Sequence, residues 1–122
     1  MYSLSHVGII AEDPVTLAKW YKDVLGFEII LEMKKEGRPP IFFLRGEKGS
    51  YIEILPSIFT THIAFVVDDF DKALKDLESK EVIFKEVRET NIGWKIGYFE
   101  DPQGNLLEIV YRPTPLEKSR ST

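Results

Sequence analysis

The chain has 122 residues, of which 43% are hydrophobic and 30% charged, and its formal net charge is −4. This composition is typical of a soluble globular domain, and it argues against disorder, against the dense positive face that nucleic acid binding needs, and against a membrane span. The absence of cysteine excludes disulfides and thiolate metal sites, which leaves histidine, carboxylate and water as metal ligands. We expect one domain over residues 1–122 in the cytoplasm, because the first residues carry no secretory signal.

The first half of the chain predicts a strand, a helix and three further strands. Residues 4–11 are apolar on both faces, as in a buried strand. A helix is expected over 14–25, because Asp13 supplies a cap, Pro14 suits the first helical position and Gly26 a stop. Its apolar stripe is predicted from Leu17, Tyr21, Val24 and Leu25, and Trp20 and Tyr21 are expected in the core. Strands are predicted over 27–34, 41–45 and 50–55.

The second half repeats this order. Asp68 and Asp69 offer a helix cap, and the helix stripe that follows consists of Phe70, Ala73, Leu74 and Leu77. Strands are expected over 82–87, 96–99 and 105–111, the last one after a turn at residues 101–104. Repeats of about 1–56 and 57–112 would each be marginal alone, so we expect them to share a core. Residues 113–122 are polar and aperiodic, which indicates a loosely held tail.

The two histidines of the chain fall at equivalent positions of this repeat. His6 in the segment Ser-His-Val-Gly-Ile-Ile and His62 in Thr-His-Ile-Ala-Phe-Val are 56 residues apart. Glu53 and Glu108, each within a later strand of its own half, are 55 residues apart. The sequence therefore indicates an internal duplication with one histidine and one glutamate in each copy.

Strand alternation predicts that these four side chains share a face of the sheet, with aliphatic residues packed under the helices on the opposite face. A lone histidine is more often structural, and a lone glutamate usually lies on a solvated face. Repetition in both copies favours a site instead, because carboxylates in apolar strands are costly unless they are paired or bound to a cation. Two imidazoles and two carboxylates suit one divalent metal, with Ni, Zn, Fe, Mn and Co left undistinguished.

With these residues in place, the chain resembles the vicinal oxygen chelate superfamily, which includes glyoxalase I, methylmalonyl-CoA epimerase, extradiol dioxygenases and bleomycin resistance proteins. The motifs that carry the resemblance are His6-Val-Gly-Ile, Trp20-Tyr-Lys-Asp-Val-Leu-Gly-Phe, Tyr51-Ile-Glu-Ile, His62-Ile-Ala-Phe and Asp101-Pro-Gln-Gly-Asn-Leu-Leu-Glu. The resemblance implies an α+β fold in which two βαβββ modules form an open, curved mixed sheet. It implies a metal inside, bound by His6, Glu53, His62 and Glu108. Many relatives are dimers, so a homodimer is a further expectation.

The ligand pattern is most similar to that of glyoxalase I, in which a metal-bound glutamate moves a proton. The resemblance therefore implies a metal-dependent lyase or isomerase of a small vicinal-oxygen substrate, with Glu53 and Glu108 as catalytic residues. Ile10 and Ser57 stand where glyoxalase I has an arginine that grips glutathione and an asparagine, which puts that thiol in doubt. The alternatives are a non-catalytic binding protein for a small molecule or antibiotic, and an Fe(II)-dependent dioxygenase.

Five further residues are candidates for substrate binding. Tyr51 and Trp94 are aromatic residues suited to a pocket wall, although packing in the core is an equal alternative. Arg38 and Arg45, together with Lys95, have the charge to meet an anionic substrate, and for them a solvated surface position is the default.

Overall fold

A computed structural model describes residues 1–116 of the chain. The elements follow one another in the order β1 (Ser3–Ala11), α1 (Pro14–Leu25), β2 (Glu28–Lys35), β3 (Arg38–Arg45), a short 3-10 helix (Glu47–Gly49) and β4 (Tyr51–Pro56). The second half continues with β5 (His62–Val66), α2 (Phe70–Ser79), β6 (Glu86–Glu89), β7 (Lys95–Glu100) and β8 (Leu106–Tyr111). The predicted order of strand, helix and three strands in each half is confirmed. Neither helix in this part of the chain is long and apolar enough to cross a membrane.

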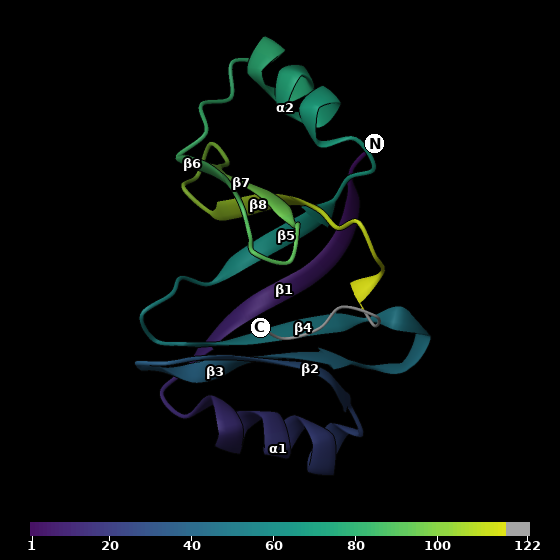
Figure 1. The fold of residues 1–122 in the computed structure, drawn as a ribbon, viewed down its shortest axis with the longest axis vertical. Coiled ribbons are helices and arrows are strands. Elements are labelled where there is room, and N and C mark those ends of the chain that lie inside the picture. Colours follow the sequence, from purple (N-terminus) through teal and green to yellow (C-terminus); the bar gives the residue numbers. More distant parts are fainter. Residues whose placement is uncertain (117–122) are drawn as a thin grey trace.

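All eight strands of the described chain form one mixed sheet in the order β2-β3-β4-β1-β5-β8-β7-β6. Strand β1 pairs in parallel with β4, β5 pairs in parallel with β8, and β1 and β5 pair antiparallel to join the two repeats. Figure 1 shows β1 and β5 crossing the middle of the molecule, with α1 and α2 at opposite ends. The α+β fold with an open mixed sheet is thus the one the sequence predicted.

The caps that define the helices are the predicted ones. The Asp13 side chain accepts a hydrogen bond from the backbone N–H of Thr16 at 3.2 Å, and Asp69 accepts one from Lys72 at 3.0 Å. Gly26 ends α1 at a φ of 74°, a left-handed conformation that glycine adopts without steric cost. Both helices therefore begin where a side-chain oxygen satisfies a free N–H group at the helix terminus.

Each helix covers the aliphatic face of its own repeat. On α1, Ala18 packs with Phe42, Leu44 and Ile54, whereas on α2, Phe70 and Ala73 pack with Phe99 and Ile109. A third cluster lies on the other face and combines residues of both repeats, namely Leu31, Phe43, Trp94, Ile96, Val110 and Leu116. The expected shared core is therefore this inner cluster. Leu116 falls within the expected tail at 113–122, of which residues 117–122 lie outside the described chain.

The structure corrects several expectations about burial. Trp20 is 48% exposed rather than in the core, and Val24 and Leu25 at the end of the predicted stripe are exposed too. Ala18 marks the buried side of α1, and Trp20 lies about 200° around the helix from it, so the Trp20 side chain points away from the sheet. Strand β1 is buried less completely than expected, since Leu4 is 65% and Val7 is 37% exposed.

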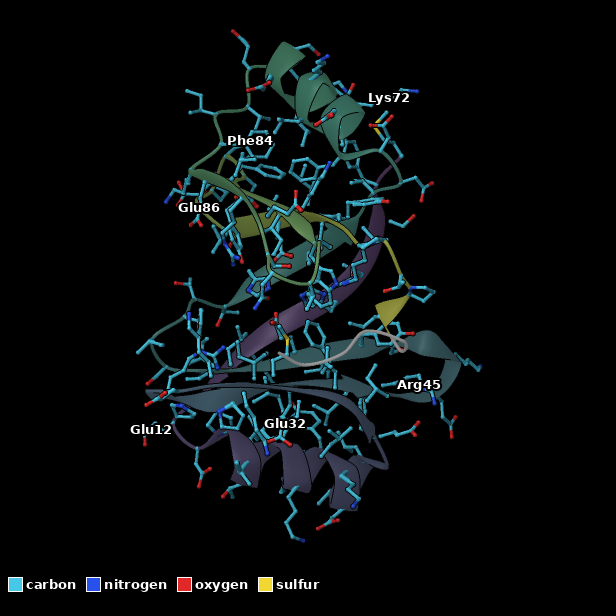
Figure 2. The ribbon with its side chains drawn as sticks, viewed as in Figure 1. Glu12, Glu32, Arg45, Lys72, Phe84 and Glu86 are labelled. Atoms are coloured by element: carbon cyan, nitrogen blue, oxygen red, sulfur yellow. The ribbon has the colours of Figure 1, made fainter. Side chains whose placement is uncertain are left out.

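One strand is also displaced. The strand expected at residues 82–87 is observed as β6, Glu86–Glu89. The apolar residues that prompted the prediction, Val82 and Phe84, lie in an irregular segment and pack against the α2 cluster instead. Figure 2 shows Phe84 below α2. Apolar residues at alternate positions thus reflect docking on the helix here and not a strand ladder.

Candidate metal centre

The four repeated ionisable side chains come together on the inner face of the sheet, as strand alternation predicted. Glu53 on β4 lies opposite Gly8, the next residue on the His6 face of β1, and Glu108 on β8 lies opposite Ala64 of β5. The residues His6, Glu53, His62 and Glu108 are only 2%, 8%, 4% and 4% exposed. The sheet thus places two imidazoles and two carboxylates in one buried cluster at the junction of the repeats.

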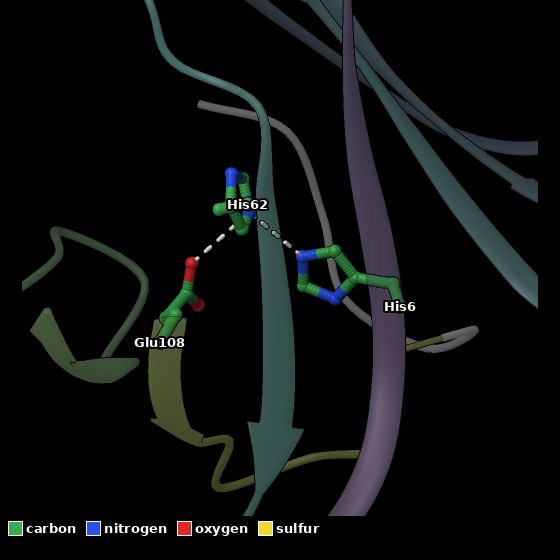
Figure 3. Close-up of side chains that lie close together, drawn as sticks. All are labelled: His6, His62 and Glu108. Carbon is green, nitrogen blue, oxygen red and sulfur yellow. Dashed lines mark hydrogen bonds and ion pairs between the residues drawn. The ribbon is translucent and has the colours of Figure 1, made fainter. Parts of the chain in front are cut away.

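The distances within this cluster are short. The Oε1 atom of Glu53 lies 3.1 Å from Nε2 of both His6 and His62. Nε2 of His62 lies 3.3 Å from Oε1 of Glu108 and 3.4 Å from Nε2 of His6, the two contacts drawn in Figure 3. The ligand atoms of His6, His62 and Glu108 all lie within 4.8 Å of one another.

These distances fit a common metal ion. Ligand atoms held at about 2.1 Å by one ion are about 3.0 Å apart in octahedral and about 3.4 Å apart in tetrahedral geometry. The four contacts within the cluster fall within that range. Imidazole and carboxylate together suit a borderline divalent ion, so the group of His6, His62 and Glu108 could hold a metal, and Oε1 of Glu53 lies 3.1 Å from Nε2 of both histidines.

Small residues on the two central strands make room for the imidazoles. A Cβ atom built on Gly8 would lie 2.3 Å from Cε1 and 2.6 Å from Nδ1 of His62. Gly8 pairs directly with His62 across the antiparallel β1 and β5 strands, and Ala64 occupies the corresponding position opposite His6. The His62 ring therefore lies over the backbone of β1, in space that only glycine leaves free.

Each histidine is held by a contact to its second ring nitrogen. Nδ1 of His62 lies 3.1 Å from the carbonyl oxygen of Thr60, an acceptor that places the ring proton on Nδ1 and leaves Nε2 free to bind a metal. Nδ1 of His6 lies 3.0 Å from Oγ of Ser5, which accepts a hydrogen bond from Nη1 of Arg112 at 3.1 Å. The two histidines thus have different outer contacts, one a backbone carbonyl and one a hydroxyl that contacts a guanidinium.

Arg112 is the main residue that the sequence analysis missed. Its guanidinium carbon lies 4.4 Å from the centroid of the Trp94 ring and 5.8 Å from that of Phe43. Burial lowers the pKa of Arg112, although the charges of Glu108 and Glu53 oppose this. Its Nε is the one buried side-chain polar atom within residues 1–116 that has no hydrogen-bond partner. Arg112 follows the last strand, and no local pattern indicated that it would lie behind His6.

The charges of the metal-free cluster shift one another. Burial opposes ionisation of Glu53, but hydrogen bonds from both histidines outweigh it and lower the pKa of Glu53 to about 2. Burial likewise opposes the charged form of His62, and the hydrogen bond and charge of Glu53 raise its pKa to about 9. Burial and the charge of Glu53 raise the pKa of Glu108. The metal-free protein therefore carries protons where a metal would otherwise supply positive charge.

A cavity of about 680 Å³ opens onto the cluster. His6, Glu53 and Glu108 lie in its wall, and the apolar and aromatic part of the lining consists of Met33, Ile41, Phe43, Leu55, Phe59, Trp94, Ile96 and Tyr98. The lining comes from β2 and β3 of the first repeat and from β6 and β7 of the second, although these strands lie at opposite ends of the sheet. The sheet therefore curves so that its two ends face one another across the cavity.

The other candidate substrate residues are divided by the structure. Trp94 and Arg38 line the cavity. Tyr51 packs against the inner core cluster, and Arg45 forms an ion pair with Glu28 beside a separate surface hollow. Figure 2 shows Arg45 at the periphery of the first repeat. Neither Tyr51 nor Arg45, nor Lys95, is among the residues that line the cavity.

Tyr98 is a second residue that the sequence analysis missed. It pairs with Glu108 across β7 and β8, as Phe43 pairs with Glu53 across β3 and β4. The Phe43 ring meets His6 edge to face at 5.1 Å between centroids, and the Tyr98 ring meets His62 at 6.2 Å. Burial and the charges of Glu108 and Glu53 raise the pKa of Tyr98, so its phenol stays neutral. The offset of 55 residues between Phe43 and Tyr98 was the signal available in the sequence.

Comparison with known proteins identifies the family. The model of the Glyoxalase/Bleomycin resistance protein/Dioxygenase superfamily matches residues 3–109, and the chain belongs to this superfamily. The uncharacterized protein YaeR of Escherichia coli (strain K12) is 32% identical, with 85% of this chain and 92% of that protein covered. YwkD of Bacillus subtilis (strain 168) is 28% identical, with 88% and 94% covered.

Solved structures agree on the fold. Methylmalonyl-CoA epimerase from Mycobacterium tuberculosis superimposes with a TM-score of 0.77 at 21% identity, covering 91% of this chain and 88% of that one. A variant of Streptomyces coelicolor methylmalonyl-CoA epimerase in complex with 2-nitronate-propionyl-CoA gives a TM-score of 0.73 at 24% identity, with 91% and 97% covered. These likenesses confirm the vicinal oxygen chelate fold predicted from the sequence.

Proposed function

We propose that this protein is a metal-dependent isomerase or lyase that acts on a small molecule with two neighbouring oxygen atoms. The observation that carries the proposal is the buried cluster of His6, Glu53, His62 and Glu108, whose ligand atoms are 3.1 to 3.4 Å apart in the contacts described above. Four ionisable groups buried next to an open cavity are costly for a protein that uses them only for structure.

The chain's own residues have distinct roles in this proposal. His6, His62, Glu53 and Glu108 would hold the divalent ion, and the ion would supply a Lewis acid for the substrate oxygens. The carboxylate of Glu53 or Glu108 takes the proton from the carbon next to the carbonyl group, and a proton is then delivered to the opposite face of that carbon or to the neighbouring carbon, which gives the isomer. The aromatic walls formed by Phe43, Trp94 and Tyr98 exclude water from the reacting carbon.

The duplication suits an isomerase in particular. Inverting a carbon centre requires a proton to leave from one face and return to the other. Glu53 and Glu108 come from different repeats and lie on β4 and β8, which flank the central strands β1 and β5. Epimerases of the same fold bind CoA esters, as in the complex with methylmalonyl-CoA and NH4+, so an acidic C–H next to a thioester or ketone is a reasonable substrate feature.

Two other functions are alternatives that the experiment described below distinguishes from this one. A protein that only sequesters a small molecule does not need four converging metal ligands, so the cluster weighs against it. An Fe(II) dioxygenase needs open coordination positions for oxygen and substrate, and Glu53, whose Oε1 lies 3.1 Å from Nε2 of both histidines, would occupy one of them.

The experiment begins with metal analysis of the purified protein, followed by removal of metal and reloading with Ni, Zn, Fe, Mn or Co in turn. We expect about one ion per chain, loss of binding in His6→Ala and His62→Ala, and metal-dependent activity in a screen of oxygen-chelating substrates that includes thioesters and 2-oxoaldehyde thiol adducts. Metal-independent ligand binding without product favours the sequestering protein, and oxygen uptake with catechol-like substrates favours the dioxygenase. Wild-type metal content in both histidine variants excludes the proposed centre.

A further inference from the structure

The mouth of the cavity is positively charged although the whole chain is not. Its exposed and half-buried lining contains the cations Lys34, Lys35, Arg38 and Arg88 against the acids Glu36 and Glu89. The whole chain carries a net charge of −4. Cations outnumber acids four to two in this part of the lining, and an excess of positive charge around a cleft favours anionic ligands.

Arg38, like its neighbour Lys35, is a cation in this lining that makes no ion pair with a carboxylate of residues 1–116. Lys34 lies 3.9 Å from Glu32 and Arg88 lies 2.9 Å from Glu86, whereas Arg38 makes no ion pair with any of residues 1–116. Its Nη1 donates a hydrogen bond to the carbonyl oxygen of Pro39 at 2.8 Å, which uses one of the five N–H donors of a guanidinium. The half-buried Arg38 thus keeps both its charge and most of its donors available.

The guanidinium of Arg38 is also held in place. Its carbon lies 5.7 Å from the centroid of the Phe59 ring, and both residues line the cavity. Arg38 begins β3 directly after the tight turn from β2, where it pairs with Lys35. A positioned guanidinium binds carboxylate and phosphate groups in a bidentate manner, and Lys35 adds a second positive charge beside it.

From this arrangement we infer that the substrate has two chemically different ends. Its vicinal oxygens bind at the metal centre, its middle lies against the apolar wall, and an anionic group, a carboxylate or a phosphate, pairs with Arg38 at the mouth. This inference rests on the proposed function, because it takes the metal centre as the site of the other end. It goes further by defining the substrate class as anionic.

Hydroxamates of graded chain length test the inference, because a hydroxamate is a vicinal-oxygen chelator of divalent metals. Each chain length is prepared with a carboxylate, a phosphonate or an uncharged methyl ester at the far end, and binding to the Co²⁺-loaded protein is measured from the change in the Co²⁺ absorption spectrum. We expect at least one anionic compound to bind about tenfold or more tightly than its ester counterpart. Whether the carboxylate or the phosphonate series shows the larger gain distinguishes the two anions.

Two arginine variants provide a matched comparison. Arg38→Gln should abolish the preference for the anionic end and Arg38→Lys should keep part of it, whereas Arg45→Gln, which removes the same charge outside the cavity, should leave it intact. Equal affinity of anionic and ester compounds for the wild type overturns the inference and leaves the metal function standing, as does an undiminished preference in Arg38→Gln. If no hydroxamate perturbs the Co²⁺ spectrum, the proposed function itself fails.

Discussion

Gly8 and His62 face one another across the junction of the repeats, and the imidazole ring of His62 fills the space that a side chain on Gly8 would occupy. A Cβ atom on Gly8 would approach three ring atoms of His62 to between 2.3 and 2.9 Å. The position of a proposed metal ligand therefore depends on the absence of a side chain on the neighbouring strand.

The first prediction is that Gly8→Ala displaces His62 and lowers metal affinity at least tenfold, a loss similar to that caused by disturbing the outer contacts of metal ligands. Isothermal titration of the metal-free protein measures this. Gly37→Ala is the control, because a Cβ there meets no atom within 4 Å and its cost is backbone strain of about 1 kcal/mol at a φ of 88°. Unchanged metal affinity in Gly8→Ala would show that His62 is not a ligand.

The second prediction concerns Arg112 and its contacts with Trp94 and Ser5. Arg112→Met should reduce the free energy of unfolding by about 2 kcal/mol, through loss of the cation–π contact and of the hydrogen bond to Ser5. Ser5→Ala should cost about 1 kcal/mol and keep the contact with Trp94. Both variants free the His6 ring to rotate, so both should also weaken metal binding, whereas Arg45→Gln should not. Urea unfolding and metal titration measure the two effects, and an Arg112→Met protein as stable as the wild type contradicts the prediction.

The third prediction separates the two roles assigned to the glutamates. If Glu53 or Glu108 moves the proton as well as binding the metal, then replacing that residue by glutamine should reduce kcat at least a hundredfold, while metal affinity falls much less. The amide keeps an oxygen ligand but cannot accept the proton. Turnover measured at saturating metal provides the comparison. Parallel losses of kcat and metal affinity in both variants would mean that the carboxylates are ligands only.

The fourth prediction concerns the stability of the metal-free protein above neutral pH. The pKa of His62 is raised from 6.5 to about 9, so the stability gained from its protonated form is fully present below pH 6.5 and is lost as the pH rises to about 9. The free energy of unfolding should fall by roughly 2 kcal/mol across this window. Chemical unfolding at a series of pH values measures the slope.

His62→Gln is the control for that slope, because the amide fills similar space and does not titrate. Its stability should change less between pH 6.5 and 9. At lower pH the pKa of Glu53, lowered to about 2, acts in the opposite sense, so its contribution is present above pH 4.5 and is lost as the pH falls towards 2. The metal-loaded protein should instead gain stability as the pH rises towards neutrality, since protons compete with the metal for the histidines.

Much of the site could be predicted from the sequence, because the site residues recur at equivalent positions of the two repeats. Strand alternation placed His6 and Glu53 on one face, and the duplication placed His62 and Glu108 in the same way. What could not be predicted depends on contacts between distant segments. Arg112 reaches the site through its contact with Trp94, which is distant in sequence, and the exposure of Trp20 depends on which side of α1 packs on the sheet.

Strand β6 and the cavity lining illustrate the same limit. Val82 and Phe84 have the spacing of a strand, but their packing on α2 takes the place of a sheet ladder. The cavity is lined both by Arg38, near one end of the sheet, and by Arg88, near the other. The curvature of the sheet that brings them together cannot be predicted from the sequence of either segment. Alternation and repeats in the sequence indicate local backbone geometry. They do not indicate which distant element will bury a given side chain.

The antiparallel pairing of β1 with β5 has a consequence for how such a centre can arise. Each repeat contributes one histidine and one glutamate, so a single repeat holds only half of the ligands. The two halves are related by an approximate twofold rotation at this pair of strands, as the two copies of a symmetric dimer would be. A chain of half this length could therefore have built the same four-ligand centre only by associating with an identical copy of itself, and gene fusion would have made that association permanent.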